Sequence, residues 1–258
     1  MPALRSGEMK RGDGVESPAA TEAARGGPDK RTYVRRAFEQ IAPRYDLLNH
    51  LLSLNVDRLW RRRAVETLDW RRQPRGTYLD LCAGTMDLAA MLAGMPGFEG
   101  RIVAADFAEP MLLAGRGKAT TGTVAPLVAD AVCLPLRDGS LAGAIAAFGV
   151  RNLDDLDAGL REVRRVLEPG GRFVILDFAT PRKRIVGALY GFYFNSVLPR
   201  IGSLISGHRD AYRYLPESVA NFPSPEQLAE RMRRAGFAAV SWRSLTFGIA
   251  AIHAGTRQ

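Results

Sequence analysis

Three short segments of the sequence carry polar groups suited to binding a nucleoside. The first is the turn 80–87, Asp-Leu-Cys-Ala-Gly-Thr-Met-Asp, which follows a short apolar run. Asp106 ends a second run about twenty residues later, where a carboxylate accepts both hydroxyls of a ribose. Asp130 and Ala131 follow a third run, where a side-chain acceptor meets the exocyclic amine of an adenine. Each aspartate alone is more often a helix cap or a surface residue, so only the three segments together indicate a nucleoside.

The sequence lacks the signatures of three other kinds of site. The first turn holds a single glycine, Gly84, so the G-x-G-x-x-G fingerprint of dinucleotide-binding enzymes is absent. The three histidines lie far apart and have no metal-ligand spacing, so no metal site is expected. Cys82 and Cys133 have no partner motif for nucleophilic catalysis, and we expect Cys82 to pack in the core.

The elements that must hold these turns alternate along the chain. Helical patterns separate strand-like runs that end at Leu81, Asp106, Asp130, Gly149 and Phe178. This alternation is typical of βαβ units, which build a parallel sheet covered by helices on both faces. A ligand of such a sheet lies beyond the carboxyl ends of the strands, where the three turns meet. Two more strands, joined tightly at Gly248, are expected at the end of the chain.

Helices are predicted before, within and after this alternation. Residues 33–70 have apolar positions, Leu59 among them, at the spacing of one buried helical face. A clear apolar stripe runs from Leu156 to Leu167 and stops at a Pro-Gly-Gly sequence. A last helix begins at Ser224, which is followed by a proline at the first helical position and a capping-box glutamine; it should end at Gly236.

The composition is that of an ordinary globular protein of 258 residues, 47% apolar and 24% charged, which can bury one core. Residues 1–32 mix charges with Gly, Pro, Ala and Ser and lack the apolar segment of a secretory signal, so we expect a disordered tail before a domain at 33–258. No run reaches the ~20 apolar residues of a spanning helix. Two cysteines without a signal peptide indicate the reducing cytoplasm.

The chain is strongly basic, with a net charge of +9. Seven arginines lie between Arg58 and Arg75 against two acidic residues. This excess indicates an anionic partner, either nucleic acid or an acidic membrane surface, although a solvated helix face explains it equally well. Specific nucleic-acid binding ranks lower, because the sequence has no recognition motif and does not interleave aromatic with basic residues.

Longer segments around the turns resemble one known family. The turn DLCAGTMDLA, the segment ADFAEPML and residues 134–178 are similar to the ubiquinone/menaquinone biosynthesis C-methyltransferases of the UbiE type. The segments YDLLN, FGVRN and YRYLPES are peculiar to that family, and the resemblance runs from about Phe38 to Arg257. It implies the class I S-adenosylmethionine-dependent methyltransferase fold, a mostly parallel α/β sheet of seven strands with helices on both faces and a C-terminal antiparallel pair.

Carried over position by position, the resemblance implies that S-adenosylmethionine contacts Thr85, Asp106, Asp130, Ala131 and the adjoining Gly84. Two positions depart from the family pattern. Ala147 stands where the family has a serine before its FG-x-RN motif, so only the backbone serves there. Met86 replaces a glycine, which permits close approach and free φ, so Met86 must point away or reshape the methionine end of the pocket. We expect cofactor binding to survive both changes.

The implied reaction, methylation of a quinol ring carbon, requires a ring hydroxyl to ionise so that its ortho carbon attacks the sulfonium methyl. A phenol with a pKa of about 10 must lose its proton near pH 7, which costs roughly 4 kcal/mol. A fixed cation in a water-poor site offsets that cost, and we assign Arg151 of FGVRN to this role. The competing interpretation is a structural salt bridge to Asp154 or Asp177. Candidates to order the water that removes the proton are Tyr45, Asn152 and His208.

The expected accessory parts are helical segments at 33–75 and an apolar cover at 182–222 over the acceptor site. A prenyl tail needs a groove open to a membrane, which the cover would provide; the alternative is that this segment simply packs on the sheet. We therefore expect a prenylated quinol as substrate and peripheral contact with an anionic membrane from the cytoplasm, and leave a homodimer open.

Several functions remain as alternatives at this point. Demethylmenaquinol is the favoured acceptor, and a polyprenyl benzoquinol of ubiquinone synthesis is the alternative. An RNA base methyltransferase is disfavoured, because FGVRN stands in place of the Asn/Asp-Pro-Pro-aromatic motif. A non-catalytic quinone or lipid carrier that keeps the fold is suggested only by Met86 and Ala147.

Overall fold

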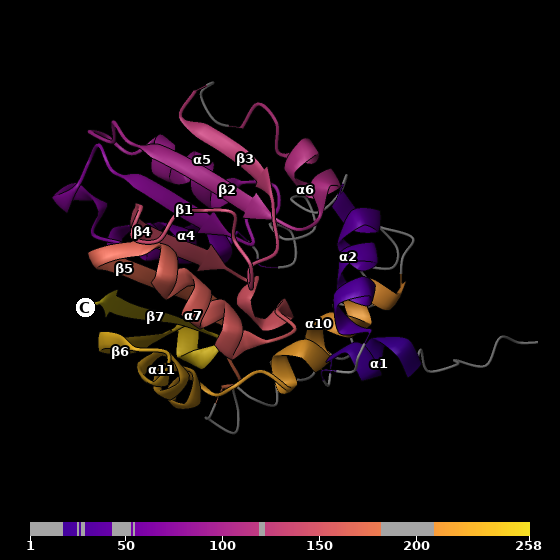
Figure 1. Ribbon diagram of the computed structural model, residues 1–258. Helices are drawn as coiled ribbons and strands as arrows, with labels where there is room; N and C mark the ends of the chain where they lie inside the picture. Colours follow the sequence, from indigo (N-terminus) through magenta and orange to yellow (C-terminus); the bar gives the residue numbers. More distant parts are fainter. Residues whose placement is uncertain are drawn as a thin grey trace, which may run out of the picture.

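A seven-stranded sheet forms the centre of the protein, as a computed structural model shows (Figure 1). The structure describes residues 18–24, 26, 29–42, 53, 55–118, 122–181 and 209–258. The strand order is β3-β2-β1-β4-β5-β7-β6. Parallel pairs join β1 (Thr77–Leu81), β2 (Arg101–Asp106), β3 (Val124–Val128), β4 (Leu141–Ala147) and β5 (Leu167–Phe178). Antiparallel pairs join β7 (Ala250–Arg257) to β5 and to β6 (Phe237–Leu245), so the predicted fold class is confirmed.

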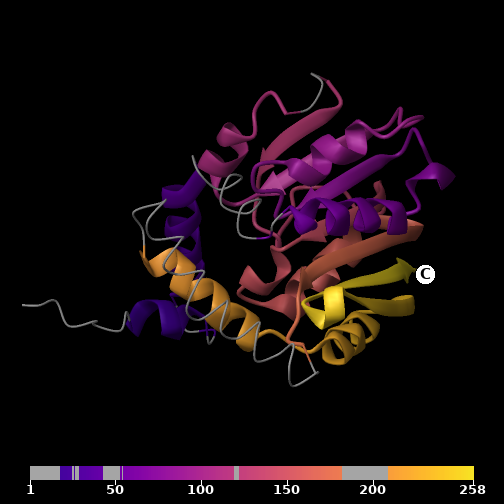
Figure 2. The ribbon, with the colours of Figure 1, turned by 180° about the vertical axis from the view of Figure 1, so that it is seen from behind.

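Helices cover both faces of the sheet (Figures 1 and 2). One face carries α4 (Val56–Thr67) and α5 (Asp87–Ala93), and the other carries α7 (Leu156–Val166) and α11 (Pro225–Arg234). The short helix α6 (Glu109–Ala114) packs near β2 and β3. Short 3-10 turns lie at η2 (Trp70–Arg72), η3 (Val150–Asn152) and η5 (Thr246–Gly248).

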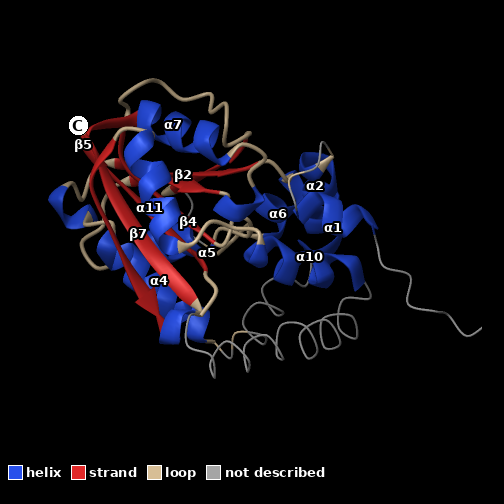
Figure 3. Cartoon of the chain, turned by 90° about the horizontal axis from the view of Figure 1, so that it is seen from below, coloured by secondary structure: helices blue, strands red, loops and turns tan. Residues whose placement is uncertain are grey.

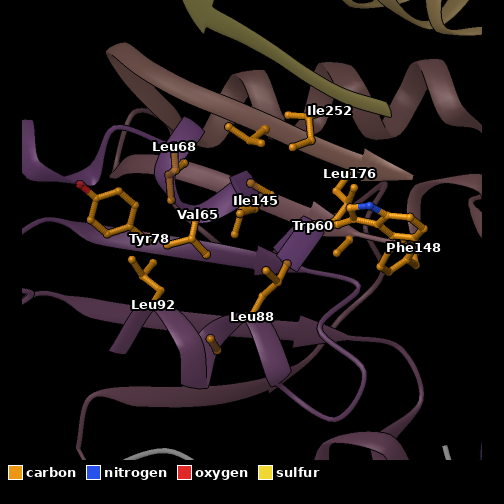
Figure 4. Close-up of a cluster of buried hydrophobic side chains, with 14 of the residues drawn as sticks. Trp60, Val65, Leu68, Tyr78, Leu88, Leu92, Ile145, Phe148, Leu176 and Ile252 are labelled. Carbon is orange, nitrogen blue, oxygen red and sulfur yellow. The ribbon is translucent and has the colours of Figure 1, made fainter. Parts of the chain in front are cut away.

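The central strands are buried on both faces because each face has its own apolar cluster. Alternate residues of the same strand contribute to the two clusters, as Ile145 and Ala144 of β4 do. The first cluster contains Val65 of α4, Leu88 of α5 and Leu176 of β5 (Figure 4). This double burial explains why the strands read as continuous apolar runs in the sequence.

Three helices form a separate group beyond the carboxyl ends of the parallel strands (Figures 1 and 3). They are α1 (Pro18–Ala24), α2 (Lys30–Ile41) and α10 (Arg209–Ala220). Val34 of α2 is fully buried against Ala24 of α1 and Tyr214 of α10. The expected tail 1–32 therefore contains helical residues, because α1 and the start of α2 bury apolar surface against a helix that follows almost two hundred residues later.

Element boundaries differ from the prediction in a few places. The strands β3 and β4 end two residues early, at Val128 and Ala147, and β5 begins at Leu167. The capping box at Ser224 is present, and α11 ends at Arg234. The prediction for Leu59 was wrong: its side chain is 49% exposed, because the bulky Trp60 fixes the buried face of α4 one position further on.

Within the described residues, no helix has the length and apolarity needed to cross a bilayer. The same residues contain no cluster of His, Cys, Asp or Glu side chains that would hold a metal ion. The predicted cover, 182–222, lies outside the described residues up to 208, and its remaining part forms α10 and the turn that follows.

Candidate functional site

A cavity of about 220 Å³ lies at the carboxyl ends of β1, β2, β3 and β4. Its walls include most of the residues predicted to bind the cofactor, which are Gly84, Asp106, Asp130, Ala131 and Ala147. Thr85, the remaining one, is buried at 2% exposure and does not line the wall. The structure thus brings together three turns, the first and last of which are more than forty residues apart in the chain, as parallel strands require.

The Asp106 carboxylate is held in place by two backbone donors. Its Oδ2 accepts from the amide of Gly84 at 2.8 Å, and its Oδ1 accepts from the amide of Ala108 at 2.9 Å. Burial raises the pKa of Asp106, and these hydrogen bonds oppose the rise. Because a carboxylate oxygen accepts more than one hydrogen bond, each Asp106 oxygen keeps capacity for a ligand hydroxyl.

The Asp130 carboxylate is also oriented by two contacts. Its Oδ1 accepts from the amide of Val132 at 3.1 Å, and its Oδ2 lies 2.8 Å from Nη2 of Arg31. Arg31 comes from α2, lines the cavity together with Phe38, and was not predicted from the sequence. A basic residue in a segment expected to be a tail carries no signal of a contact made a hundred residues away.

The wall of the cavity is acidic although the chain is basic. Four carboxylates line it, those of Asp106, Asp130, Asp154 and Asp155, and Arg31 is the basic residue among the described lining side chains. The chain as a whole carries +9. A cavity with this excess of carboxylates favours a cationic ligand, and a nucleoside with a sulfonium and an amino group matches it.

The turns after β1 and β4 are pressed against each other in unusual backbone conformations. Cys82 and Phe148 have φ values of 54° and 59°. A Cβ atom on Gly149 would lie 2.3 Å from Cβ of Cys82, so only glycine fits there. Met86 also has a left-handed φ, 63°, and its side chain is 5% exposed within the apolar cluster. Met86 is not among the walls of the cavity, which agrees with the first of the two arrangements that the sequence allowed.

The Arg151 guanidinium forms a buried ion pair with the Asp177 carboxylate. Its Nη1 lies 2.8 Å from Oδ1 of Asp177 and also donates to the carbonyl of Phe148, and the side chains of the pair are 6% and 2% exposed. Arg151 is not among the walls of the cavity. The ion pair matches the salt bridge to Asp177 that was the competing interpretation, because burial of both groups requires that they pair. The role of Arg151 as a cation that stabilises the phenolate stays a prediction.

The other predicted catalytic residues have different outcomes. Asn152 lines the cavity, and its Oδ1 is buried without a hydrogen-bond partner among the described residues. Tyr45 and His208 lie outside the described residues. Tyr214 of α10, which was not among these candidates, is 4% exposed, and burial raises the pKa of its hydroxyl, which has no partner within the described part of the chain.

Two buried ionisable side chains near these turns were not predicted from the sequence. The Arg61 guanidinium is buried on α4, pairs with Asp57 at 3.4 Å and lies 5.2 Å from the ring centre of Phe148. Asp80 is buried at 1% exposure, its Oδ2 accepts from the amide of Ala89 at 2.9 Å, and burial raises its pKa to about 7. An Arg-rich helix and an aspartate inside a strand give no sign of such contacts in the sequence.

Comparison with known sequences finds close relatives along almost the whole described domain. A profile of the ubiE/COQ5 methyltransferase family matches residues 28–257. The Demethylmenaquinone methyltransferase of Thermus thermophilus is 52% identical, over 85% of this chain and 99% of the relative. A protein of the same name from Deinococcus radiodurans is 47% identical over 89% and 95%. The Ubiquinone/menaquinone biosynthesis C-methyltransferase UbiE of Geobacter sulfurreducens is 43% identical over 89% and 90%.

Solved structures share the fold at low sequence identity. A SAM-dependent methyltransferase of Thermotoga maritima superposes with a TM-score of 0.60 at 20% identity, covering 86% of this chain and 99% of that one. The [4+2]-cyclase SpnF superposes with a TM-score of 0.63 at 16% identity, covering 87% and 94%. Because a methyltransferase and a cyclase share this fold, the fold alone does not determine the reaction.

Proposed function

The chain belongs to the ubiE/COQ5 methyltransferase family, and we propose that it methylates a ring carbon of a prenylated quinol, with demethylmenaquinol as the acceptor. It is an S-adenosylmethionine-dependent methyltransferase. The observation that carries the proposal is an identity of 52% with a Demethylmenaquinone methyltransferase over nearly its whole length. A second relative of that name is 47% identical, which favours demethylmenaquinol over the benzoquinol alternative.

The residues of the cavity fit the methyl donor. S-Adenosylmethionine, when bound, supplies an electrophilic methyl group on a sulfonium. The Asp106 carboxylate is placed to accept hydrogen bonds from the ribose hydroxyls, and the Asp130 carboxylate to accept one from the exocyclic amine of adenine. Phe107 and Met111 line the same cavity and offer apolar surface to the base. The acidic wall stabilises the positive charge of the donor.

We assign two roles near the acceptor to the segment 148–152. The Oδ1 atom of Asn152 is a buried acceptor that lacks a partner among the described residues, so it is suited to accept a hydrogen bond from the ring hydroxyl or from the water that removes its proton. Arg151 acts as a positioning residue: its ion pair with Asp177 and its hydrogen bond to the Phe148 carbonyl fix the turn. The pair also explains why an apolar replacement of Arg151 would leave a buried carboxylate unpaired.

Direct turnover tests this function. The purified protein is incubated with methyl-labelled S-adenosylmethionine and either demethylmenaquinol or the polyprenyl benzoquinol precursor. We expect label in the naphthoquinol product, and a higher kcat/KM for that acceptor. Labelling of the benzoquinol alone would contradict the choice of acceptor, and labelling of neither would support a carrier that keeps the fold.

We further propose that the protein contacts an anionic membrane with the edge of the sheet that bears the site. Phe247, 74% exposed in η5, and Leu59, 49% exposed on α4, belong to segments joined there by a 2.9 Å hydrogen bond from Nε1 of Trp60 to Oγ1 of Thr246. The exposed Arg58 precedes Leu59. An apolar pair beside a basic residue suits an anionic lipid surface.

Liposome flotation at low salt tests the membrane contact. The protein should float with anionic vesicles, and Phe247→Ser should float less, whereas full solubility of the parent would contradict the proposal. The replacement is expected to leave the cofactor cavity unchanged, since Phe247 is not among its walls. A homodimer stays a prediction, which light scattering would check.

A further inference from the structure

Two neighbouring basic residues at the start of α2 reach opposite rims of the cofactor cavity. The Nζ atom of Lys30 donates to the carbonyls of Arg151 and Leu153, at 3.2 and 2.6 Å. The Nη2 atom of Arg31 lies 2.8 Å from Oδ2 of Asp130. Leu153 and Asp130 both line the cavity, one in the segment after β4 and the other after β3. One helical turn is thus attached to both rims.

The Lys30 side chain is buried. It is 8% exposed, and burial lowers the pKa of its ammonium while Asp154 opposes that effect. Its two acceptors are backbone carbonyls of the segment that presents Asn152 to the cavity. A buried ammonium requires partners, so this segment must keep its position relative to α2 for the ammonium to stay satisfied.

The Arg31 contact is of a different kind. The Arg31 side chain is 61% exposed and that of Asp130 is 25% exposed, and an ion pair in such a setting contributes little to stability. Its effect is geometrical, because the other Asp130 oxygen is already held by the amide of Val132. Together the two contacts fix the plane of the carboxylate that faces the adenine end of the cavity.

The helix that carries both residues is itself anchored. Val34 is fully buried between α1 and α10, and Phe38, two turns after Arg31, lines the cavity. Figure 1 shows α2 standing beyond the carboxyl ends of the strands. The contacts of Lys30 and Arg31 therefore transmit the position of a packed helix to the two rims.

We propose that Lys30 and Arg31 are positioning residues of the cofactor site, which hold the turns after β3 and β4 at a fixed separation. This inference rests on the proposed function for its cofactor, but the geometry concerns the chain alone. Loss of either contact lets one rim move, so the cofactor binds more weakly and leaves faster. The rate at saturating cofactor changes less than KM, because neither residue touches the reacting atoms.

The first test compares Arg31→Gln with Arg35→Gln in the full chain. Arg35 is the matched control: it lies one turn further on the same helix, is similarly exposed, and pairs with Glu39 of that helix at 3.6 Å. We expect Arg31→Gln to weaken S-adenosylmethionine binding in calorimetry by up to about fivefold, with faster release of S-adenosylhomocysteine and the same Tm as the control. Equal or tighter binding than in Arg35→Gln would overturn the role of Arg31.

The second test needs no cofactor and so separates this inference from the proposed function. Hydrogen exchange is measured on the amides of residues 149–153 and 129–132 in the protein without ligand. Lys30→Met should speed exchange at 149–153, Lys30→Arg should restore part of the protection, and Arg31→Gln should speed exchange at 129–132. Unchanged exchange at 149–153 in both Lys30 variants would overturn the role of Lys30. If Lys30→Met fails to fold, exchange at 149–153 in Lys30→Arg tests the role of Lys30, and exchange at 129–132 in Arg31→Gln tests the role of Arg31.

Discussion

At the scale of single residues, Asp106 is the side chain on which cofactor affinity depends most directly. It is 8% exposed and lines the cavity, and the amides of Gly84 and Ala108 hold its two oxygens. Hydrogen bonds to a charged acceptor contribute about 1.5–3 kcal/mol each, so Asp106→Ala should weaken S-adenosylmethionine binding roughly a hundredfold or more. Calorimetry measures this. Asp106→Asn, which keeps one acceptor, should lose less, and affinity within twofold of the parent in Asp106→Ala would contradict the assignment.

Met86 tests whether a departure from the family pattern affects the site. Replacement by glycine removes the left-handed strain at φ 63° but also a side chain buried in the apolar cluster. Strain of this kind costs about 1 kcal/mol or more, whereas a buried methionine contributes about 2–5 kcal/mol. We expect Met86→Gly to lower Tm and to leave cofactor affinity within about twofold. Met86→Leu, which keeps the bulk, serves as control, and a large gain in affinity in Met86→Gly alone would mean that Met86 shapes the pocket.

The residues of the cavity differ in how far the sequence could predict them. Asp106 ends β2 and Asp130 lies two residues after β3, and both were found because the carboxyl ends of parallel strands lie at one edge of the sheet. Lys30 and Arg31 were not found, because their partners are backbone carbonyls and a carboxylate that only the tertiary structure brings near. For Arg151 the sequence offered two roles, and its ion pair with Asp177 could not be chosen over one with Asp154, because the burial of Asp177 follows from the pairing of β5 with β4 and β7.

At the scale of elements, α11 shows how local chemistry sets a helix boundary. Oγ of Ser224 accepts from the amide of Gln227, and the side chain of Gln227 accepts from the amide of Ser224. Loss of an N-cap costs about 1 kcal/mol, which lowers Tm by about 2–4 °C in a protein of this size. Ser224→Ala should show this in thermal unfolding. Ser241→Ala, at an exposed strand position, is the control; an equal effect of both would argue against the cap.

Elements with purely local signals were predicted best. The capping box of α11 and the apolar stripe of α7 depend on residues three or four apart, and both helices occur where expected. The start of α2 depends on packing against α1 and α10, so the composition of residues 1–32 alone could not indicate it. Leu59 was misplaced for a related reason: periodicity gives a helical face only approximately, and Trp60, at 4% exposure, decides which face is buried.

At the scale of the whole molecule, two buried groups make stability depend on pH in opposite directions. Burial raises the pKa of Asp80 from 3.8 to about 7, so the folded protein binds the extra proton between these values and stability falls as pH rises. Burial lowers the pKa of His253 from 6.5 to about 4, so the unfolded chain binds the extra proton there and stability falls as pH drops. Each effect has a slope of about 1.36 kcal/mol per pH unit.

Because the two slopes have opposite signs, they cancel between about pH 4 and 6.5 in the parent protein. Single variants should therefore reveal each slope in the free energy of unfolding measured by denaturant titration. Asp80→Asn should gain stability relative to the parent as pH rises from 4 to 8, up to about 4 kcal/mol. His253→Gln should gain relative to the parent as pH falls from 6.5 to 4.

The double variant tests whether the two effects are independent. Asp80 lies in β1 and His253 in β7, with β4 and β5 between them in the sheet, so their effects should add. The pH dependence of Asp80→Asn with His253→Gln should then run parallel to that of the parent between pH 4 and 6.5, whatever the constant offset from changed packing. Above pH 6.5 the double variant should rise relative to the parent, because only the Asp80 difference continues there. A difference from the parent that stays constant with pH in both single variants would mean that neither group is held in the neutral state that its burial favours.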